Sequence, residues 1–361
     1  MDAQQVSRLT TRWTEALPGD GSTVLSGYGA APLLAVLGSV AVEPARSELM
    51  AAGGQWAGLL PGTPELRAAI GLWTRPEVPL EPGLDQVIPA QLRGVLTGRQ
   101  ALDRWVVEQT DGLLERMPVQ LTAETLLVLA SALAVRTTWA QPFEAWERGV
   151  GGRSVWWLSR VDPDLSTVRC HDTANGAMTA VTVRGSGAID VRLVVADPAV
   201  ARNKVLAAAV GLGEGGADAV RLLEGLPSPA VSVVETMDPQ PTVTLSVPYF
   251  EVDAEHDLLA CPEVFGLVTA SDPRRGHFPG LSSMPLAVSQ AKQAVMARFS
   301  ATGFEAAAVT AIPAVAGSAP IPGARGLRVD LDRPFAFVAV HRPTGTPLVA
   351  GWADESAYKV V

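Results

Sequence analysis

One stretch near the C-terminus constrains the fold more than any other, because it has the composition of a strand that can enter or leave a sheet. Residues 303–311 read GFEAAAVTA: a glycine, an acidic residue and then a row of small side chains. Small side chains at alternate positions fit into a sheet without forcing its neighbours apart, and Gly303 can supply the change of backbone dihedrals at a pivot. Three consecutive alanines also favour a helix, so the segment alone leaves both interpretations open.

The residues that follow favour the movable strand. Between residues 313 and 325 the chain contains three prolines, two glycines and few large side chains. Neither a helix nor a central strand can run through such a segment. Residues 331–340 and 343–351 then read as two apolar strands joined by a turn. The sequence therefore predicts a hinge, a long exposed loop over about 303–327 and a closing hairpin.

At these residues the chain resembles the serpin family, and further similar blocks occur upstream in the family's order. Residues 102–112 resemble the serpin helix that lies across the main sheet, and residues 125–133 resemble a central strand of that sheet. The remaining blocks are 138–143 with Trp139 and a Pro-Phe pair, 243–250 followed by Asp257-Leu258, and 278–282. The resemblance covers roughly residues 1–50 and 100–361.

The order of the expected elements favours an α+β fold, because helices come first and strands dominate later, without a repeating βαβ alternation. Helices are expected near 4–17, 29–52, 101–116, 198–210 and 217–224, and strands near 66–74, 123–134, 179–196, 242–251, 286–300 and 327–351. The resemblance implies a serpin fold, with a large mixed central β-sheet, additional sheets and surrounding helices, in a single domain over residues 1–361.

Composition narrows the partners and the location of the protein. With 48% hydrophobic and 18% charged residues the chain can bury a sizeable core, and its net charge of −9 argues against nucleic acid or an acidic membrane surface as a partner. Residues 1–9 lack a basic segment followed by an apolar run, so we expect a cytoplasmic protein, and a monomer. Cys170 and Cys261 lie far apart and without metal spacing, which favours buried free thiols over a disulfide.

The sequence contains few motifs that are typical of catalysis, so we expect no catalytic residues, no metal and no cofactor. The four histidines occur without an HExxH pattern, and no GxSxG motif lies nearby. Residues 211–216 are rich in glycine but lack the Lys-Ser/Thr ending of a phosphate loop, so they read as a turn. The run Cys170-His171-Asp172 favours a structural role, because adjacent residues rarely converge on one point.

The resemblance implies a suicide-substrate inhibitor of serine proteases. Such a loop is offered to a protease, which forms an acyl bond through its serine, and the cut segment then inserts as a new strand and traps the acyl state. Gly303 matches the proximal hinge of the family and Glu305 its acidic residue. The small residues that insert would be Ala306, Ala307 and Ala308.

The bond offered to the protease has more than one candidate. Family spacing from the hinge places it near Ala316, Gly317 and Ser318, where small apolar side chains suit an elastase-like or subtilisin-like pocket. Counting back from Pro334-Phe335 points instead toward Gly323, and Arg325 would suit a trypsin-like protease.

Several departures from the family leave other functions open. Phe304 stands where inhibitory members carry a small residue, and it could gain about 2–3 kcal/mol by burial or lose about 1–3 kcal/mol by overpacking. Pro313 would remove one ladder donor, Gln293 stands where many members have a histidine, and residues 55–64 are too few for a family helix. The main alternative is a non-inhibitory serpin scaffold that binds a small molecule or peptide, including a repurposed biosynthetic enzyme. An interaction or chaperone-like module is a third.

Overall fold

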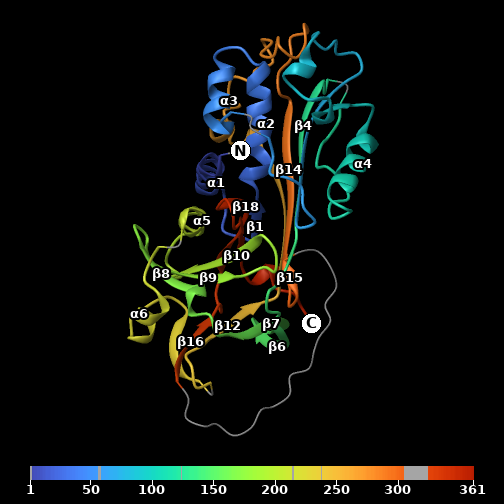
Figure 1. The fold of residues 1–361 in the computed structure, drawn as a ribbon. Coiled ribbons are helices and arrows are strands. Elements are labelled where there is room, and N and C mark those ends of the chain that lie inside the picture. Colours follow the sequence, from blue (N-terminus) through green and yellow to red (C-terminus); the bar gives the residue numbers. More distant parts are fainter. Residues whose placement is uncertain (1, 56–57, 123, 214, 237, 305–323) are drawn as a thin grey trace.

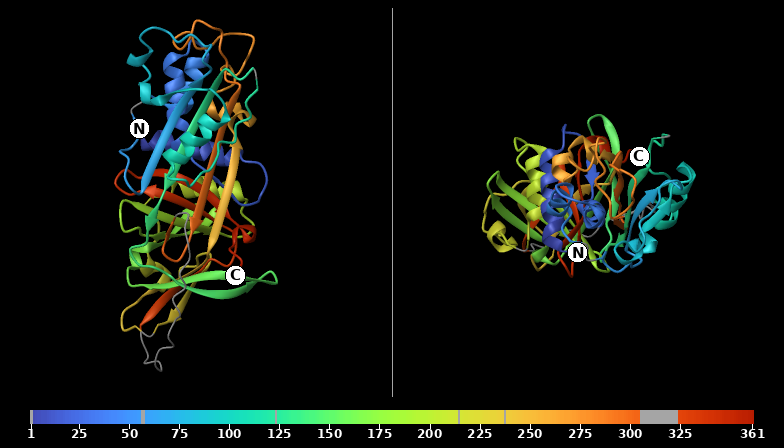
Figure 2. Two further views of the ribbon diagram at one scale, coloured as in Figure 1. Left: turned by 90° about the vertical axis from the view of Figure 1, so that its right-hand side faces the viewer. Right: turned by 90° about the horizontal axis from the view of Figure 1, so that it is seen from above.

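The computed structural model describes residues 2–55, 58–122, 124–213, 215–236, 238–304 and 324–361, in which helices surround three β-sheets (Figure 1). One sheet of long strands runs through half of the molecule, and the other two sheets lie toward the end of those strands (Figure 2). This arrangement confirms the predicted α+β fold. Among the described helices, none is both long enough and apolar enough to span a bilayer.

The long sheet has the order β3-β2-β4-β14-β15-β5, and β13 pairs with the other edge of β14. Its strands are β2 (Leu66–Thr74), β3 (Arg93–Val95), β4 (Leu127–Val135), β5 (Thr137–Thr138), β13 (Phe250–Asp257), β14 (Gln290–Phe299) and β15 (Gly303–Phe304). Strand β4 reads LVLASALAV and is buried at every position. Such a continuous apolar run is typical of a strand that is covered on both faces.

The two other sheets contain the first and last strands of the chain and the strand that follows the loop. The first has the order β1 (Thr23–Leu25), β18 (Thr346–Ala353), β17 (Phe335–His341), β10 (Ile189–Ala196), β9 (Gly176–Val183) and β8 (Val168–Thr173). The second has the order β11 (Val231–Glu235), β16 (Arg325–Asp330), β12 (Val243–Pro248), β7 (Arg153–Asp162) and β6 (Glu144–Val150). The predicted closing hairpin is confirmed as β17 and β18, which pair antiparallel.

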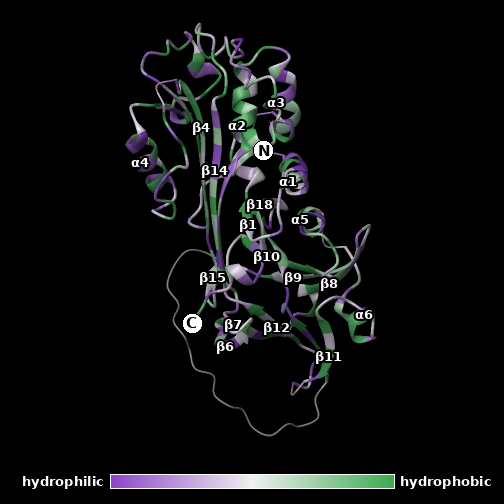
Figure 3. Ribbon diagram, turned by 180° about the vertical axis from the view of Figure 1, so that it is seen from behind, coloured by the Kyte–Doolittle hydropathy of each residue, from purple (hydrophilic) through white to green (hydrophobic). Residues whose placement is uncertain are grey.

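The described helices are α1 (Ala3–Ala16), α2 (Gly27–Val40), α3 (Ala45–Gly53), α4 (Arg99–Gln109), α5 (Arg202–Gly211), α6 (Ala219–Leu223) and α7 (Pro262–Phe265). Of these, α2 and α4 contact β2 and β4 of the long sheet, whereas α5 and α6 contact strands of the two other sheets. Helix α2 is hydrophobic almost all round (Figure 3), and nearly all of its residues are buried. A helix of that composition belongs inside a protein. Its first turn is capped by the Ser26 side chain, which accepts a hydrogen bond from the Gly29 backbone at 2.9 Å.

Two expected elements are each divided in the structure. The helix expected over 29–52 is two helices, because α2 ends at Val40 and Pro44 precedes α3; proline has no N–H to donate inside a continuous helix. The strand expected over 179–196 is the antiparallel pair β9 and β10, because the chain turns at residues 184–188, which contain Gly185 and Gly187.

Candidate functional site

Two central strands of the long sheet, β4 and β14, run parallel but are paired for only part of their length. The pairing is limited to three neighbouring residues on each strand: Gln290 with Val128, Ala291 with Leu129 and Lys292 with Ala130. Beyond these pairs, residues 131–135 and 293–297 are described but are not paired with each other. The sheet is therefore closed at one end of the strand pair and open at the end near β15.

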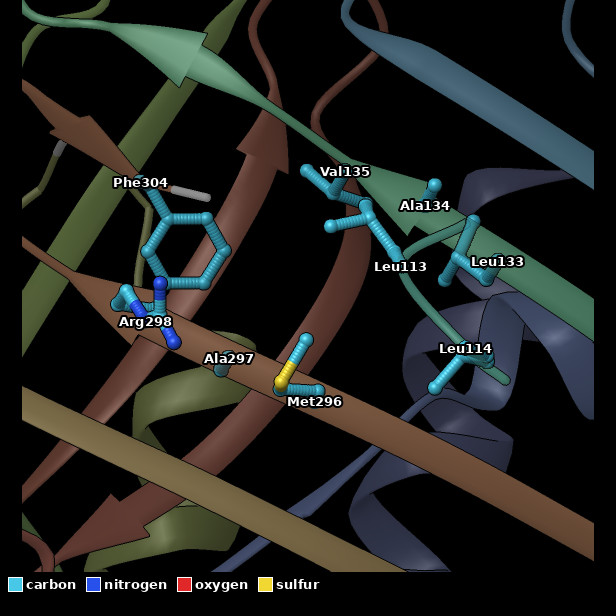
Figure 4. A pocket seen from close by; sticks show the side chains of 9 residues that line it. All are labelled: Leu113, Leu114, Leu133, Ala134, Val135, Met296, Ala297, Arg298 and Phe304. Carbon is cyan, nitrogen blue, oxygen red and sulfur yellow. The ribbon is translucent and has the colours of Figure 1, made fainter. Parts of the chain in front are cut away.

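A narrow cavity lies at the open end, between the two strands (Figure 4). Its walls come from β4, from β14, from the segment after α4 and from β15: Leu133, Ala134, Val135, Met296, Ala297, Arg298, Leu113, Leu114 and Phe304. Arg298 is the one charged side chain of this described lining, and it bonds Glu251 of β13 at 2.6 Å. The cavity volume of ≈ 20 Å³ holds about one water molecule. A larger group can enter only if β4 and β14 move apart.

Strand β15 is the described part of the predicted hinge, and it lies beside β14 where β4 has diverged. Phe304 pairs with Phe299 of β14 on one side and with Thr137 of β5 on the other. A Cβ atom on Gly303 would lie 2.4 Å from the Thr137 backbone oxygen, so only glycine fits between these strands. The need for glycine here is therefore steric, and β15 is paired on both sides in the intact chain.

The Phe304 side chain is 1% exposed and points into the core. Its ring belongs to a series of aromatic contacts that continues through Phe337 and Phe250 to Phe299. Phe299 in turn contacts Trp139, with ring centroids 4.7 Å apart. Of the two effects weighed for Phe304, burial is therefore the one that the intact structure realises.

The strand that follows the loop, β16, is held on both sides as well. It pairs antiparallel with β11 and parallel with β12. Arg325 is the first residue of β16, is exposed, and lies opposite Glu235 of β11. The structure thus places Arg325 in a sheet, and the loop ends earlier than the predicted boundary near 327. The other hinge and bait candidates lie outside the described residues: Glu305, Ala306, Ala307, Ala308, Ala316, Gly317 and Ser318.

A buried polar contact lies at the start of the unpaired part of the strand pair, directly after the three paired residues. Gln293, 2% exposed, accepts a hydrogen bond from the Ser26 N–H at 2.8 Å and donates to the Ser26 carbonyl at 2.9 Å. The Ser26 hydroxyl donates to the Leu348 carbonyl at 2.6 Å. Ser131 of β4 lies next to this group, because a Cβ on Gly29 would be 3.2 Å from Gln293 Nε2 and 3.3 Å from Ser131 Oγ. This contact joins β14 to the start of α2 and to β18.

The described residues hold no cluster of three or more histidine, cysteine or acidic side chains that could bind a metal. Both cysteines are free thiols, with Cys170 buried and Cys261 half-buried. Burial raises the pKa of the Cys261 thiol, with Glu263 and Asp257 acting in the same direction. The site therefore consists of strand edges and a hinge, an arrangement suited to a change of conformation.

Sequence reasoning missed two parts of this site. Leu113 and Leu114 close the cavity from the α4 side, and no local pattern marks them because they contact residues far away in the sequence. Strand β11 was also missed, although its run Val231-Ser232-Val233-Val234 is rich in β-branched residues, the signal that could have identified it.

A family model and individual relatives of known sequence both show similarity to serpins. The Serpin family model, described as serine protease inhibitor, matches residues 226–353. The chain is 36% identical over 115 residues to plasminogen activator inhibitor 1 of Sus scrofa, and 36% identical over 112 residues to that of Neovison vison. These matches cover 32% and 31% of this chain, and they span only 27% and 26% of the length of those relatives.

Solved structures of similar fold cover nearly the whole chain. The thermophilic serpin tengpin in its native state has a TM-score of 0.72 and 16% identity, and the match covers 98% of this chain and 94% of that one. Serpin48 of the insect Tenebrio molitor has a TM-score of 0.72, 16% identity and 97% coverage of both chains. Thyroxine-binding globulin in complex with thyroxine has a TM-score of 0.69, 18% identity and 97% coverage of both chains. These similarities confirm the predicted fold.

Proposed function

Because this chain is a member of the serpin family, we propose that it inhibits serine proteases as a suicide substrate. The protease serine attacks a carbonyl carbon in the loop and forms an ester, while the residues after that bond gain a free amino group and stay attached through β16. The esterified segment then enters the long sheet between β4 and β14 and carries the protease with it. Distortion of the protease then prevents hydrolysis of the ester.

The single observation that carries this proposal is the agreement of three strand registers. Phe304 lies opposite Phe299 on β14 and opposite Thr137 on β5. Gln290 lies nine residues before Phe299, and Val128 lies nine residues before Thr137; these two residues are themselves paired. A strand that continued from Phe304 would therefore fit both neighbours without a bulge. It would meet the first paired residues, Lys292 and Ala130, at Ala311 and the last, Gln290 and Val128, at Pro313.

The side chains that would enter this slot match its two faces. On the core face, where Phe304 points, each inserted side chain would lie between one residue of β14 and one of β4. Ala306 would lie between Ala297 and Val135, and Ala308 between Val295 and Leu133. Thr310 would lie between Gln293 and Ser131, and Ile312 between Ala291 and Leu129. The one polar residue in this series, Thr310, would meet the two polar side chains of the slot. On the other face, Glu305 would arrive between the positively charged Arg298 and Arg136.

Insertion of this segment supplies a large driving force. Its residues would bond to β4 on one side and β14 on the other, and on the order of ten ladder hydrogen bonds at about 1 kcal/mol each give about 10 kcal/mol. Burial of the apolar side chains adds to that sum. Pro313 reduces the gain by only one donor, because it comes at the far end of the slot.

The target class follows from where the bait bond lies. A slot that is filled as far as Pro313 favours cleavage just beyond it, at Ala316, Gly317 or Ser318, and small side chains there suit an elastase-like or subtilisin-like protease. The pairing of Arg325 with Glu235 disfavours Arg325 as bait for a trypsin-like protease, because a protease needs its target bond in an accessible extended segment.

Incubation with subtilisin-like, elastase-like and trypsin-like proteases tests the proposal. We expect a covalent complex that survives detergent, formed by one of the first two classes, and mass spectrometry of the released C-terminal fragment identifies the bond. The cleaved protein should also melt at a markedly higher temperature than the intact protein, because it has gained a strand. Clean cleavage without a complex and without a rise in melting temperature would refute the inhibitor.

A non-inhibitory carrier of a small molecule is the second candidate, because one similar fold is that of thyroxine-binding globulin in complex with thyroxine. The cavity between β4 and β14 is too small for such a ligand. A carrier would therefore bind elsewhere, and its cleavage would leave the melting temperature unchanged. Thermal-shift screening with hydrophobic small molecules separates it from the inhibitor.

A further inference from the structure

Between α4 and β4 the chain crosses the face of the long sheet that α4 covers. There it packs against β2 and β4. Met117 and Val119 of this crossing segment (residues 117–122) are buried in one cluster with Trp73 of β2 and Val128 of β4. Among the described residues, none from β14 belongs to that cluster. The crossing segment is therefore packed onto β2, β4 and α4, and it must move with them.

One side chain from β14 reaches across the strand pair to the crossing segment. The Gln120 N–H donates to Gln290 Oε1 at 3.0 Å, and Gln290 Nε2 donates to the Gln120 carbonyl. Gln290 Nε2 also lies 3.4 Å from the Thr125 hydroxyl oxygen. Arg75, just after β2, donates to the carbonyls of Thr122 at 2.6 Å and Thr125 at 3.0 Å, so the backbone that Gln290 binds is fixed to the β2 side.

The Gln290 carboxamide thus binds the Gln120 backbone as an added strand residue would, with one bond accepted and one donated. This double contact joins the two halves of the sheet next to the three residue pairs that close it. Insertion of a strand moves β14 away from β4 by about 4.8 Å. A hydrogen bond of 3.0 Å cannot survive such a displacement.

We propose that Gln290 is a positioning residue that holds the strand pair closed and sets the rate of strand insertion; the inference rests on the proposed function. The backbone bonds between β4 and β14 are replaced by bonds to the incoming strand. The bonds from Gln290 to Gln120 have no such replacement, so they oppose the opening step. Insertion competes with hydrolysis of the ester, and Gln290 therefore also determines what share of the molecules traps a protease.

The rate of opening can be measured without any protease. The probe is a fluorescent synthetic peptide of residues 305–313, EAAAVTAIP, added to the intact protein and followed by anisotropy. We expect Gln290→Ala to take up the peptide about threefold to tenfold faster than the unaltered chain, the effect of losing one or two hydrogen bonds. Gln290→Glu should also be faster, because its carboxylate cannot donate to the Gln120 carbonyl.

The matched control is Gln5→Ala. Gln5 also uses its carboxamide to bind backbone carbonyls, those of Ala51 and Ala52, but it joins α1 to α3 and does not cross the strand pair. Its uptake rate should equal that of the unaltered chain. Equal rates for both Gln290 variants and the unaltered chain would overturn the role of Gln290. Absence of uptake in all variants, with no rise in melting temperature after cleavage, would instead overturn strand insertion and the proposed function.

Discussion

The ring of Phe304 packs against the ring of Phe337, with centroids 6.2 Å apart and planes inclined by 59°. Phe304 belongs to the hinge strand β15, and Phe337 belongs to β17 of the closing hairpin. The contact ties the start of the loop to the strand that lies beyond its end. The bulky side chain of Phe304 therefore anchors β15 against β17 in the intact protein.

We expect Phe304→Ala to destabilise the intact and the cleaved protein by similar amounts. In the proposed mechanism the ring stays in its site during insertion, so the loss of about 3–5 kcal/mol for truncating a buried phenylalanine applies to both forms. Urea unfolding of each form measures this loss. The exposed Val107→Ala serves as control and should change either form by less than about 0.5 kcal/mol. A loss confined to the intact form would show that Phe304 leaves its site when the strand inserts.

In the proposed mechanism, Ala308→Arg should convert the protein from an inhibitor into a substrate of the protease. If the segment inserts in the register of Phe304, residue 308 would lie on the core face between Val295 and Leu133, where a guanidinium would be buried without a partner. Cleavage itself needs no insertion, so the protease should cut the variant at the normal rate and release it. Ala308→Ser, which adds only a hydroxyl, should still form the complex. Detergent gels quantify complex and cleaved protein, and a full yield of complex with Ala308→Arg would refute this register.

Local patterns predicted the parts of the site that are continuous in sequence. The small residues after Gly303, the prolines beyond them and the apolar hairpin each carry a local signal, and the hairpin is found where it was expected. The steric need for glycine at Gly303 was not predictable, because it comes from the Thr137 backbone oxygen in another strand.

The parts that sequence could not predict depend on pairing between distant segments. The contact of Gln290 with Gln120 joins residues 170 positions apart, and neither glutamine differs locally from an ordinary polar residue. The pairing of β11 with β16 was also not predictable from local sequence, because a β-branched run indicates a strand but not its neighbour in the sheet. Periodicity also failed to divide residues 29–52, because both helices there are rich in alanine and glycine.

Because of His256, the free energy of unfolding of the intact protein should decrease as the pH is lowered below about 6.5. Burial lowers the pKa of His256 from its ordinary 6.5, and Arg202 acts in the same direction, against the hydrogen bond from Nε2 to the Val24 carbonyl. The folded ring stays neutral where the unfolded ring takes up a proton. Stability is therefore complete above about pH 6.5 and declines, by at most about 1.4 kcal/mol per pH unit, toward the lowered folded pKa.

Urea unfolding between pH 5 and 7.5 measures this slope. His256→Asn should flatten it, because asparagine does not titrate. Burial also lowers the pKa of His341, against the charge of Glu65, so His341 should leave a residual slope in the same direction. An unchanged slope in His256→Asn would show that another group takes up the proton.

Gln293→Ala should destabilise the intact protein by about 2–4 kcal/mol. It removes two hydrogen bonds to the Ser26 backbone and leaves the buried Ser26 N–H without its acceptor, whereas the Ser26 carbonyl still accepts from Ala30 at 3.2 Å. The same substitution at Gln5, which has one exposed and one half-buried hydrogen bond, should cost less than half as much. Urea unfolding of the two variants at constant pH compares these losses. Because the Gln293 carboxamide does not titrate, the difference between them should be the same at pH 5.5 and pH 7.5, and a difference that changed over this range would show that the Gln293 contact is linked to a titrating group.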